Sequence, residues 1–88
     1  MTAEEAYKIL SKEYPAMKVR TCLDFGSFFA FCLAPINVED TDEYMTGTCM
    51  DAVDKKTGRT FIYDITTDLD AYERAKEVKC KTIYDKPI

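Results

Sequence analysis

Carboxylates and thiols are the side chains of this sequence that could carry out chemistry, because the chain contains no histidine. General acid–base catalysis near neutral pH would therefore require a carboxylate or a thiol with a shifted pKa. The clearest pair is Asp51 and Asp64, which a hairpin predicted around residues 52–65 would place diagonally on one open face, close enough to bind a divalent ion or share a proton. In a small acidic protein such a pair is usually just solvated, so we expect no enzymatic activity, no metal and no cofactor.

The cysteines carry no recognisable catalytic or metal-binding motif. No C-x-x-C spacing occurs among the four cysteines, and the chain has no histidine to complete a zinc site; the cysteines are Cys22, Cys32, Cys49 and Cys80. Cys32 as a nucleophile would lack an imidazole to deprotonate it. We expect reduced structural thiols, and a four-cysteine metal site or a functional disulfide are the alternatives.

The charges are distributed unevenly along the chain. The net charge is −4, and no lysine or arginine occurs between Arg20 and Lys55, where all seven charged residues are acidic. Four of them lie in "INVEDTDEYMTG" (36–47), which we interpret as an exposed loop. Such a segment repels itself, which favours a basic protein partner. The lysines near the C-terminus are interleaved with acids, so no binding to a nucleic-acid backbone is expected.

The hydrophobic pattern predicts one α+β domain over residues 1–88, beginning with a helix at residues 2–13. Thr2 and Glu5 have the spacing of a capping box, and Pro15 ends the helix. From Met17 onward the apolar period changes to two, which predicts a strand, and "FGSF" turns the chain into a second strand. The longest apolar run is about ten residues, short of the roughly 20 of a membrane helix. The N-terminus also lacks the lysines of a signal peptide, so we expect a cytoplasmic protein that does not enter a membrane.

The register of this first hairpin determines which side chains face water. Pairing Phe25 with Phe29 would gather the apolar residues on one face and place Cys22 opposite Cys32 on the other. A two-residue Gly26-Ser27 turn is the alternative. Because burial favours the first register, we expect Phe25 to pair with Phe29.

A second hairpin, "AVDKKTGRTFIYDI", completes a four-stranded antiparallel meander. A four-residue turn at 55–58 requires a left-handed residue, which Gly58 supplies. The register then pairs Ala52 with Phe61 and Met50 with Tyr63 on the core side. A helix capped by Thr67 or Asp68 follows in "TTDLDAYERAKEV". We expect both helices on one face of the sheet, with the other face uncovered.

The candidate partner-binding residues come from the acidic loop, the open sheet face and the first turn. Phe28 stands out because an apolar side chain at a turn has little structural reason to be there. The full set is Phe28, Glu39, Asp40, Asp42, Glu43, Tyr44, Asp51 and Asp64.

The motif "VDKKTGRTF", preceded by "DFGSFFAF" and followed by "DLDAYERA", resembles the small α-β-β-β-α proteins of Gram-positive bacteria and their prophages. It is also faintly similar to toxin-immunity and PepSY-like domains that share a strand-"VDxxTG"-strand hairpin. Those proteins have one strand fewer than is predicted here, and no site residue transfers because turn geometry explains Asp54, Thr57 and Gly58. The resemblance implies a non-enzymatic module that binds or inhibits another protein. We expect an inhibitor or immunity-type protein of a bacterium or a phage, which occludes a basic partner with its acidic loop and uncovered sheet face. The alternatives are a homodimer formed through the uncovered sheet face and a metal-assisted enzyme using Asp51 and Asp64.

Overall fold

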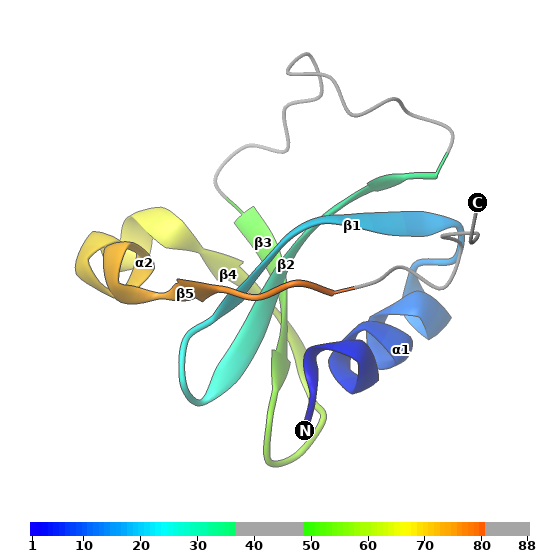
Figure 1. Cartoon of the computed structure of the whole chain (residues 1–88), viewed down its shortest axis with the longest axis horizontal. Helices are drawn as coiled ribbons and strands as arrows, with labels where there is room; N and C mark the ends of the chain where they lie inside the picture. Colours follow the sequence, from blue (N-terminus) through cyan, green and yellow to red (C-terminus); the bar gives the residue numbers. More distant parts are fainter. Residues whose placement is uncertain (37–48, 81–88) are drawn as a thin grey trace.

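A computed structural model describes residues 1–36 and 49–80 of the chain. Its elements are α1 (Ala3–Glu13), β1 (Met17–Asp24), β2 (Phe28–Pro35), β3 (Cys49–Asp54), β4 (Thr60–Asp64), the 3-10 turn η1 (Ile65–Thr67), α2 (Leu69–Arg74) and β5 (Lys76–Glu77). The strands form one antiparallel sheet in the order β4-β3-β2-β1-β5 (Figure 1). The predicted α+β class and the four-stranded meander are confirmed, and a fifth strand is added.

Helix α1 forms as its sequence predicts. The Thr2 hydroxyl accepts a hydrogen bond from the Glu5 amide at 3.2 Å, and the Glu5 carboxylate accepts one from the Thr2 amide at 3.0 Å. This capping box satisfies two of the amides that a helix N-terminus leaves without intrahelical partners. One stripe of the helix is buried against the sheet, and it consists of Ala3, Ala6, Tyr7 and Leu10.

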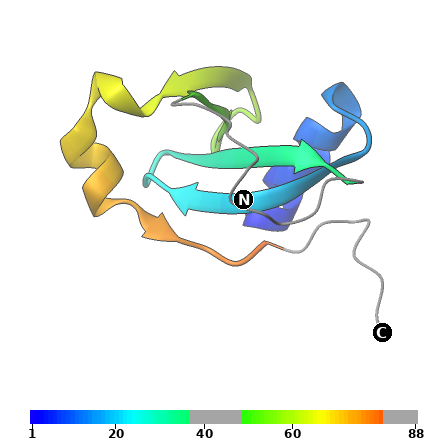
Figure 2. The ribbon, with the colours of Figure 1, turned by 90° about the horizontal axis from the view of Figure 1, so that it is seen from above.

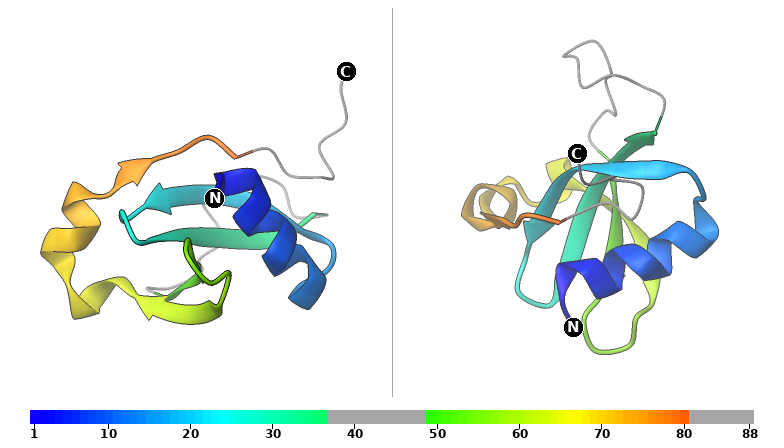
Figure 3. Two further views of the ribbon diagram at one scale, coloured as in Figure 1. Left: turned by 90° about the horizontal axis from the view of Figure 1, so that it is seen from below. Right: turned by 45° about the vertical axis from the view of Figure 1, so that its right-hand side comes forward.

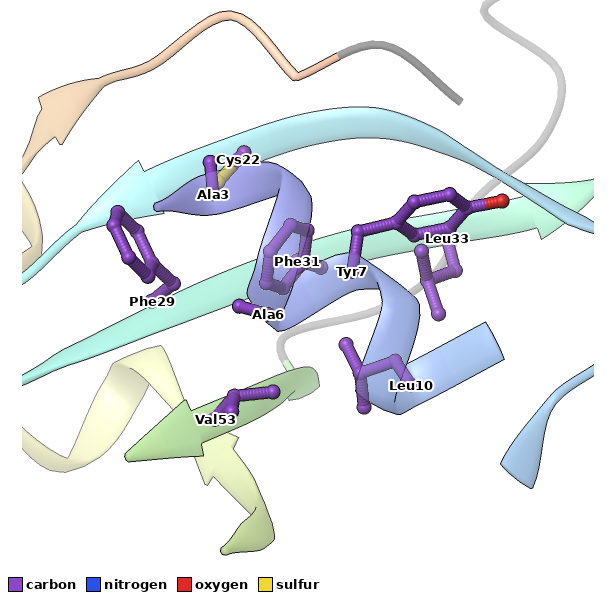
Figure 4. Close-up of a cluster of buried hydrophobic side chains, with 9 residues drawn as sticks. All are labelled: Ala3, Ala6, Tyr7, Leu10, Cys22, Phe29, Phe31, Leu33 and Val53. Atoms are coloured by element: carbon purple, nitrogen blue, oxygen red, sulfur yellow. The ribbon is translucent and has the colours of Figure 1, made fainter. Parts of the chain in front are cut away.

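The main core lies between α1 and one face of the sheet, which we call the helix face. Figure 4 shows the α1 stripe pointing toward side chains of three strands, namely Cys22, Phe29, Phe31, Leu33 and Val53. The Tyr7 hydroxyl donates a hydrogen bond to the Met17 carbonyl at 2.7 Å, so its polar end has a partner. Deep burial of three aromatic rings and several aliphatic chains supplies the main driving force for this packing.

The register of the first hairpin differs from the expected one. Phe29 pairs with Asp24, and Cys22 pairs with Phe31. The turn is the two-residue alternative: the Phe25 amide donates to the Phe28 carbonyl at 3.0 Å, and Gly26 has a φ of +95°. The pairing also shifts by one residue between Val19 and Thr21, which places a bulge at Arg20.

The predicted Cys22–Cys32 pairing is therefore wrong. Cys32 lies opposite Thr21, and Cys22 is buried on the helix face. The expectation assumed that only one face of the sheet carries apolar residues. Instead both faces do, because Leu23, Ala30, Met50 and Ala52 form a second buried cluster on the side away from α1. We call this second side the open face.

The register of the second hairpin is confirmed, but its two faces are reversed. Ala52 pairs with Phe61 and Met50 with Tyr63, as predicted. These pairs lie on the open face, whereas Val53 belongs to the helix-face core. At the turn, Gly58 has a φ of +72° and its amide donates to the Asp54 carbonyl at 2.9 Å, so the predicted left-handed position is also confirmed.

The C-terminal part of the described chain forms a shorter helix than expected. Asp68 caps α2, as one of the two predicted caps, but the helix ends at Arg74 and the chain continues as β5 along β1. The Val78 amide donates to the Cys22 carbonyl at 2.9 Å, and the Val78 side chain packs on the helix-face core. Sheet pairing and burial thus replace the last predicted helical turn.

The expected placement of both helices on one face is corrected by the position of α2. Helix α1 lies across the sheet, while α2 lies at the far end and connects β4 to β5 (Figures 2 and 3). Its main neighbour is η1, and Leu69 and Tyr72 on its apolar side are exposed. A helix of six residues followed at once by β5 is too short to cross back over the sheet. Neither described helix has the length and apolar composition needed to span a membrane.

Candidate interaction surface

An aromatic cluster lies on the open face. Phe25 and Phe28 stack with their ring centroids 4.8 Å apart and an interplanar angle of 10°. The Tyr63 ring lies 4.9 Å from Phe25 and 5.1 Å from Phe28, and Phe61 meets Phe28 edge-on at 5.3 Å. We call these four residues the aromatic cluster. Such offset and tilted contacts stabilise the rings relative to one another.

Phe28, predicted as an exposed contact residue, is half-buried inside this cluster. Phe25, Phe61 and Tyr63 were predicted to lie in the core, so they are not among the predicted contact residues. The alternation of Phe61 and Tyr63 along β4 puts both rings on one face, but the pattern does not indicate which face the helix covers. Phe61 is the most exposed of the cluster, with 36% of its surface accessible.

Strand β4 is the outer strand of the described sheet beside this cluster. The Asp54 amide donates to the Arg59 carbonyl at 2.9 Å, and the register continues without a break to Cys49 and Asp64. Because hydrogen-bonded pairs alternate in an antiparallel ladder, the backbone groups of Thr60 and Ile62 point away from β3. Ile62 also has 62% of its surface exposed. The edge therefore offers outward-directed backbone groups between apolar side chains on both faces.

Two carboxylates flank this edge on the helix face. Asp51 pairs with Ile62 across the strands and is hydrogen-bonded by the Tyr14 hydroxyl. The Glu13 carboxylate accepts a hydrogen bond from the Thr60 hydroxyl at 2.8 Å. Burial raises the pKa of Asp51, and the nearby negative charge of Glu13 raises it further. The Asp51 charge in turn raises the pKa of Tyr14.

A shallow pocket of about 170 Å³ lies next to these carboxylates. Its lining is Leu10, Tyr14, Asp51, Thr60, Phe61 and Ile62, among which no residue is basic. The pocket combines apolar walls with a carboxylate whose ionisation is disfavoured. A cationic group brought there would offset the repulsion between the Asp51 and Glu13 carboxylates and the cost of burying the Asp51 charge.

The predicted Asp51–Asp64 pair shares one sheet face, as expected, but that face is the helix face and not the open one. Asp64 caps η1, where its carboxylate accepts hydrogen bonds from the Thr66 amide at 3.0 Å and the Thr66 hydroxyl at 2.7 Å. Within residues 1–36 and 49–80, no group of three or more potential ligands could hold a metal ion. The geometry therefore favours a capping role for Asp64.

The acidic loop of the prediction lies outside the described residues, and so do its candidates Glu39, Asp40, Asp42, Glu43 and Tyr44. Among the described residues of the segment without lysine or arginine, Asp24 forms an ion pair with Lys55, which the fold brings next to it. The Lys55 ammonium lies 2.7 Å from the Asp24 carboxylate and 4.5 Å from the Phe29 ring centroid. The hydrogen bond from Lys55 lowers the pKa of Asp24, and one from the Gly26 amide adds to this effect.

All four cysteines are thiols. Cys22 is almost fully buried in the helix-face core, and this burial raises its pKa to about 12. A thiol with so little thiolate at neutral pH is a poor nucleophile. Cys49, by contrast, is exposed at the start of β3.

Comparison of the chain with protein-family models, with curated proteins and with solved structures gives no match.

Proposed function

We propose that this protein is a small non-enzymatic module that binds an extended segment of another protein along the edge of β4. The observation that carries the proposal is the outer side of β4, where the backbone groups of Thr60 and Ile62 point away from the sheet beside an Ile62 side chain that is 62% exposed. An added strand would satisfy these backbone groups and cover the apolar side chains on both faces.

The middle of β4 lacks the features that proteins use to protect an edge. Natural edge strands carry lysines, prolines, bulges or inward-pointing charges that discourage pairing. Residues 60–63 are "TFIY", with none of these, and the ladder to β3 has no bulge; the nearest charges along the chain flank this stretch, at Arg59 and Asp64. At the opposite end of the described sheet, the two-residue β5 pairs with β1 at Leu23 and Asp24, and the Val78 amide donates to the Cys22 carbonyl. The difference between the two edges supports β4 as the side kept open for a partner.

The mode of action we propose is occlusion, in which the module covers part of its partner without chemical change. The resemblance of "VDKKTGRTF" to prophage and immunity-type hairpins favours an inhibitor or immunity-type protein of a bacterium or a phage. The net charge of −4 favours a basic partner, and the four thiols favour a reducing compartment such as the cytoplasm.

The second candidate function is self-assembly through the open face. It is favoured by the aromatic cluster, which lies on the sheet face away from α1, and by the exposure of Phe61 at its border. Sedimentation separates the two candidates: a tight homodimer at micromolar concentration supports self-assembly, and a monomer supports a foreign partner.

The binding proposal is tested by selecting peptides from a displayed random library against the purified protein. The selected peptides are then measured against Ile62→Lys, which places a charge on the edge, and against Leu69→Lys. Leu69 is the matched control because it is 56% exposed on α2, away from β4. We expect binding to be lost in Ile62→Lys and kept in Leu69→Lys. Failure to select any peptide, or equal binding to both variants, would contradict the proposal.

A further inference from the structure

The two sides of the β4 edge differ in chemistry, and an added strand must present one set of side chains to each. Phe61 and Tyr63 lie on the open face within the aromatic cluster, whereas Thr60 and Ile62 lie on the helix face with Asp51 and Glu13. Side chains of a strand alternate between its two faces. Every second residue of an incoming strand therefore meets the aromatic cluster, and the residues between them meet the carboxylates.

On the helix face, the acids lie within reach of a long side chain on the added strand. Neighbouring strands are about 4.8 Å apart, so an incoming residue opposite Ile62 would begin about 10 Å from the Asp51 backbone. A lysine or arginine can span this gap by laying its apolar stem over Ile62. Glu13 is closer still, because the Thr60 hydroxyl on β4 itself donates to its carboxylate at 2.8 Å.

From this geometry we infer that β4 selects an extended partner segment in which apolar residues alternate with lysine or arginine. The inference rests on the proposed binding at β4 and specifies its partner. The apolar residues extend the aromatic cluster at Phe61 and Tyr63, and the basic residues lie over Ile62 and Thr60 toward Asp51 and Glu13.

Electrostatic complementarity favours this occupant over a second copy of the chain. A two-fold pairing of β4 with itself would bring Asp51, Glu13 and Asp64 of both copies to the same face, which like charges disfavour. A basic segment instead compensates two carboxylates, one of which is already costly to ionise because of its burial and its acidic neighbour.

The test uses three synthetic peptides with a fluorescent label and their affinities measured by anisotropy. The first alternates valine with lysine, the second has the same composition with its valines and lysines in separate blocks, and the third alternates valine with glutamate. We expect the first peptide to bind roughly ten-fold more tightly than the third, because two exposed ion pairs replace two repulsions. Its affinity should fall with added salt.

The double variant Glu13→Gln, Asp51→Asn should remove most of the difference between the lysine and glutamate peptides. Asp70→Asn is the matched control, since Asp70 is an exposed acid on α2 away from the edge, and it should leave the difference unchanged. Equal binding of the block and alternating peptides would overturn the inferred pattern. So would equal binding of the lysine and glutamate peptides.

Two results distinguish failure of this inference from failure of the proposed function. If all three peptides bind with similar affinity and Ile62→Lys weakens each of them, the edge binds strands without the inferred selectivity, and only the inference fails. If Ile62→Lys weakens none of them, the edge is not the binding site and both proposals fail. A homodimer that Ile62→Lys converts to monomer would make a second copy the occupant and would also overturn the inference.

Discussion

Replacing Gly58 with alanine tests the link between the β3–β4 turn and the stability of the fold. Gly58 adopts a φ of +72°, a conformation that costs a residue with a Cβ about 1–2 kcal/mol. Alanine also lowers the conformational entropy of the unfolded chain, which stabilises the fold and offsets about 0.4–1 kcal/mol of that cost. The new Cβ would lie 3.3 Å from Ile9 Cδ1, a tight contact with the end of a flexible side chain. We expect a net loss of about 1 kcal/mol in the free energy of unfolding, or about 4–8 °C in Tm.

The assay is urea unfolding followed by circular dichroism, with two matched variants. Gly26→Ala introduces a Cβ at a φ of +95° with no heavy atom within 4 Å, so it reports backbone strain without a new contact. Ile9→Val removes the Cδ1 atom that the Gly58→Ala side chain would approach. If strain dominates, the cost of Gly58→Ala is the same in the Ile9→Val background. Unchanged or increased stability of Gly58→Ala would refute the argument.

Two further predictions concern titratable groups. Asp51→Asn should increase the free energy of unfolding at pH 7 and have little effect on it at pH 3. Burial raises the folded-state pKa of Asp51, so the cost of ionising this carboxyl appears as pH rises through that pKa. Urea unfolding at the two pH values measures the difference. The same variant should lower the pKa of Tyr14 in an absorbance titration, because the Asp51 charge is the main cause of its increase. Cys49 should react with a thiol reagent well before Cys22, because Cys49 is exposed and burial raises the pKa of Cys22 to about 12. Mass spectrometry of the labelled protein measures the order of reaction, and the reverse order would show that Cys22 is not buried.

Features fixed by neighbouring residues could be predicted from the sequence. The capping box of α1 depends on two residues three positions apart, and both side chains take part as expected. The left-handed Gly58 and the register of β3 with β4 follow from turn length alone. In each case the deciding interactions lie within a few residues of one another.

Features that depend on distant contacts could not be predicted. The Gly26-Ser27 turn was disfavoured because it places Asp24 on the same face as Phe29 and Phe31. In the fold, Lys55 lies 31 positions along the chain and neutralises that carboxylate at 2.7 Å, which removes the objection. Strand β5 likewise has no signal of its own, because Lys76 and Glu77 are polar and continue a helical pattern. It forms because the edge of β1 supplies a partner.

The prediction of the candidate interaction surface depended on the same register of the first hairpin. An error of one residue in the first hairpin exchanged the two faces of the sheet, so the aromatic residues at the β4 edge were taken for core. The edge position of β4 followed from the meander order, which was predicted correctly. Only the packing of α1 shows which face remained open beside it.

The pairing of β5 with β1 also bears on how the chain behaves while it is being made. Synthesis proceeds from the N-terminus, so all four meander strands are available once Asp64 has left the ribosome. Until Lys76 and Glu77 follow, the nascent sheet has two unprotected edges, β4 and β1. An unpaired edge can capture a strand from a neighbouring nascent chain on the same messenger RNA. The arrival of β5 shortens that exposure by pairing with Leu23 and Asp24 of β1, whereas β4 is still the outer strand among the residues that the structure describes.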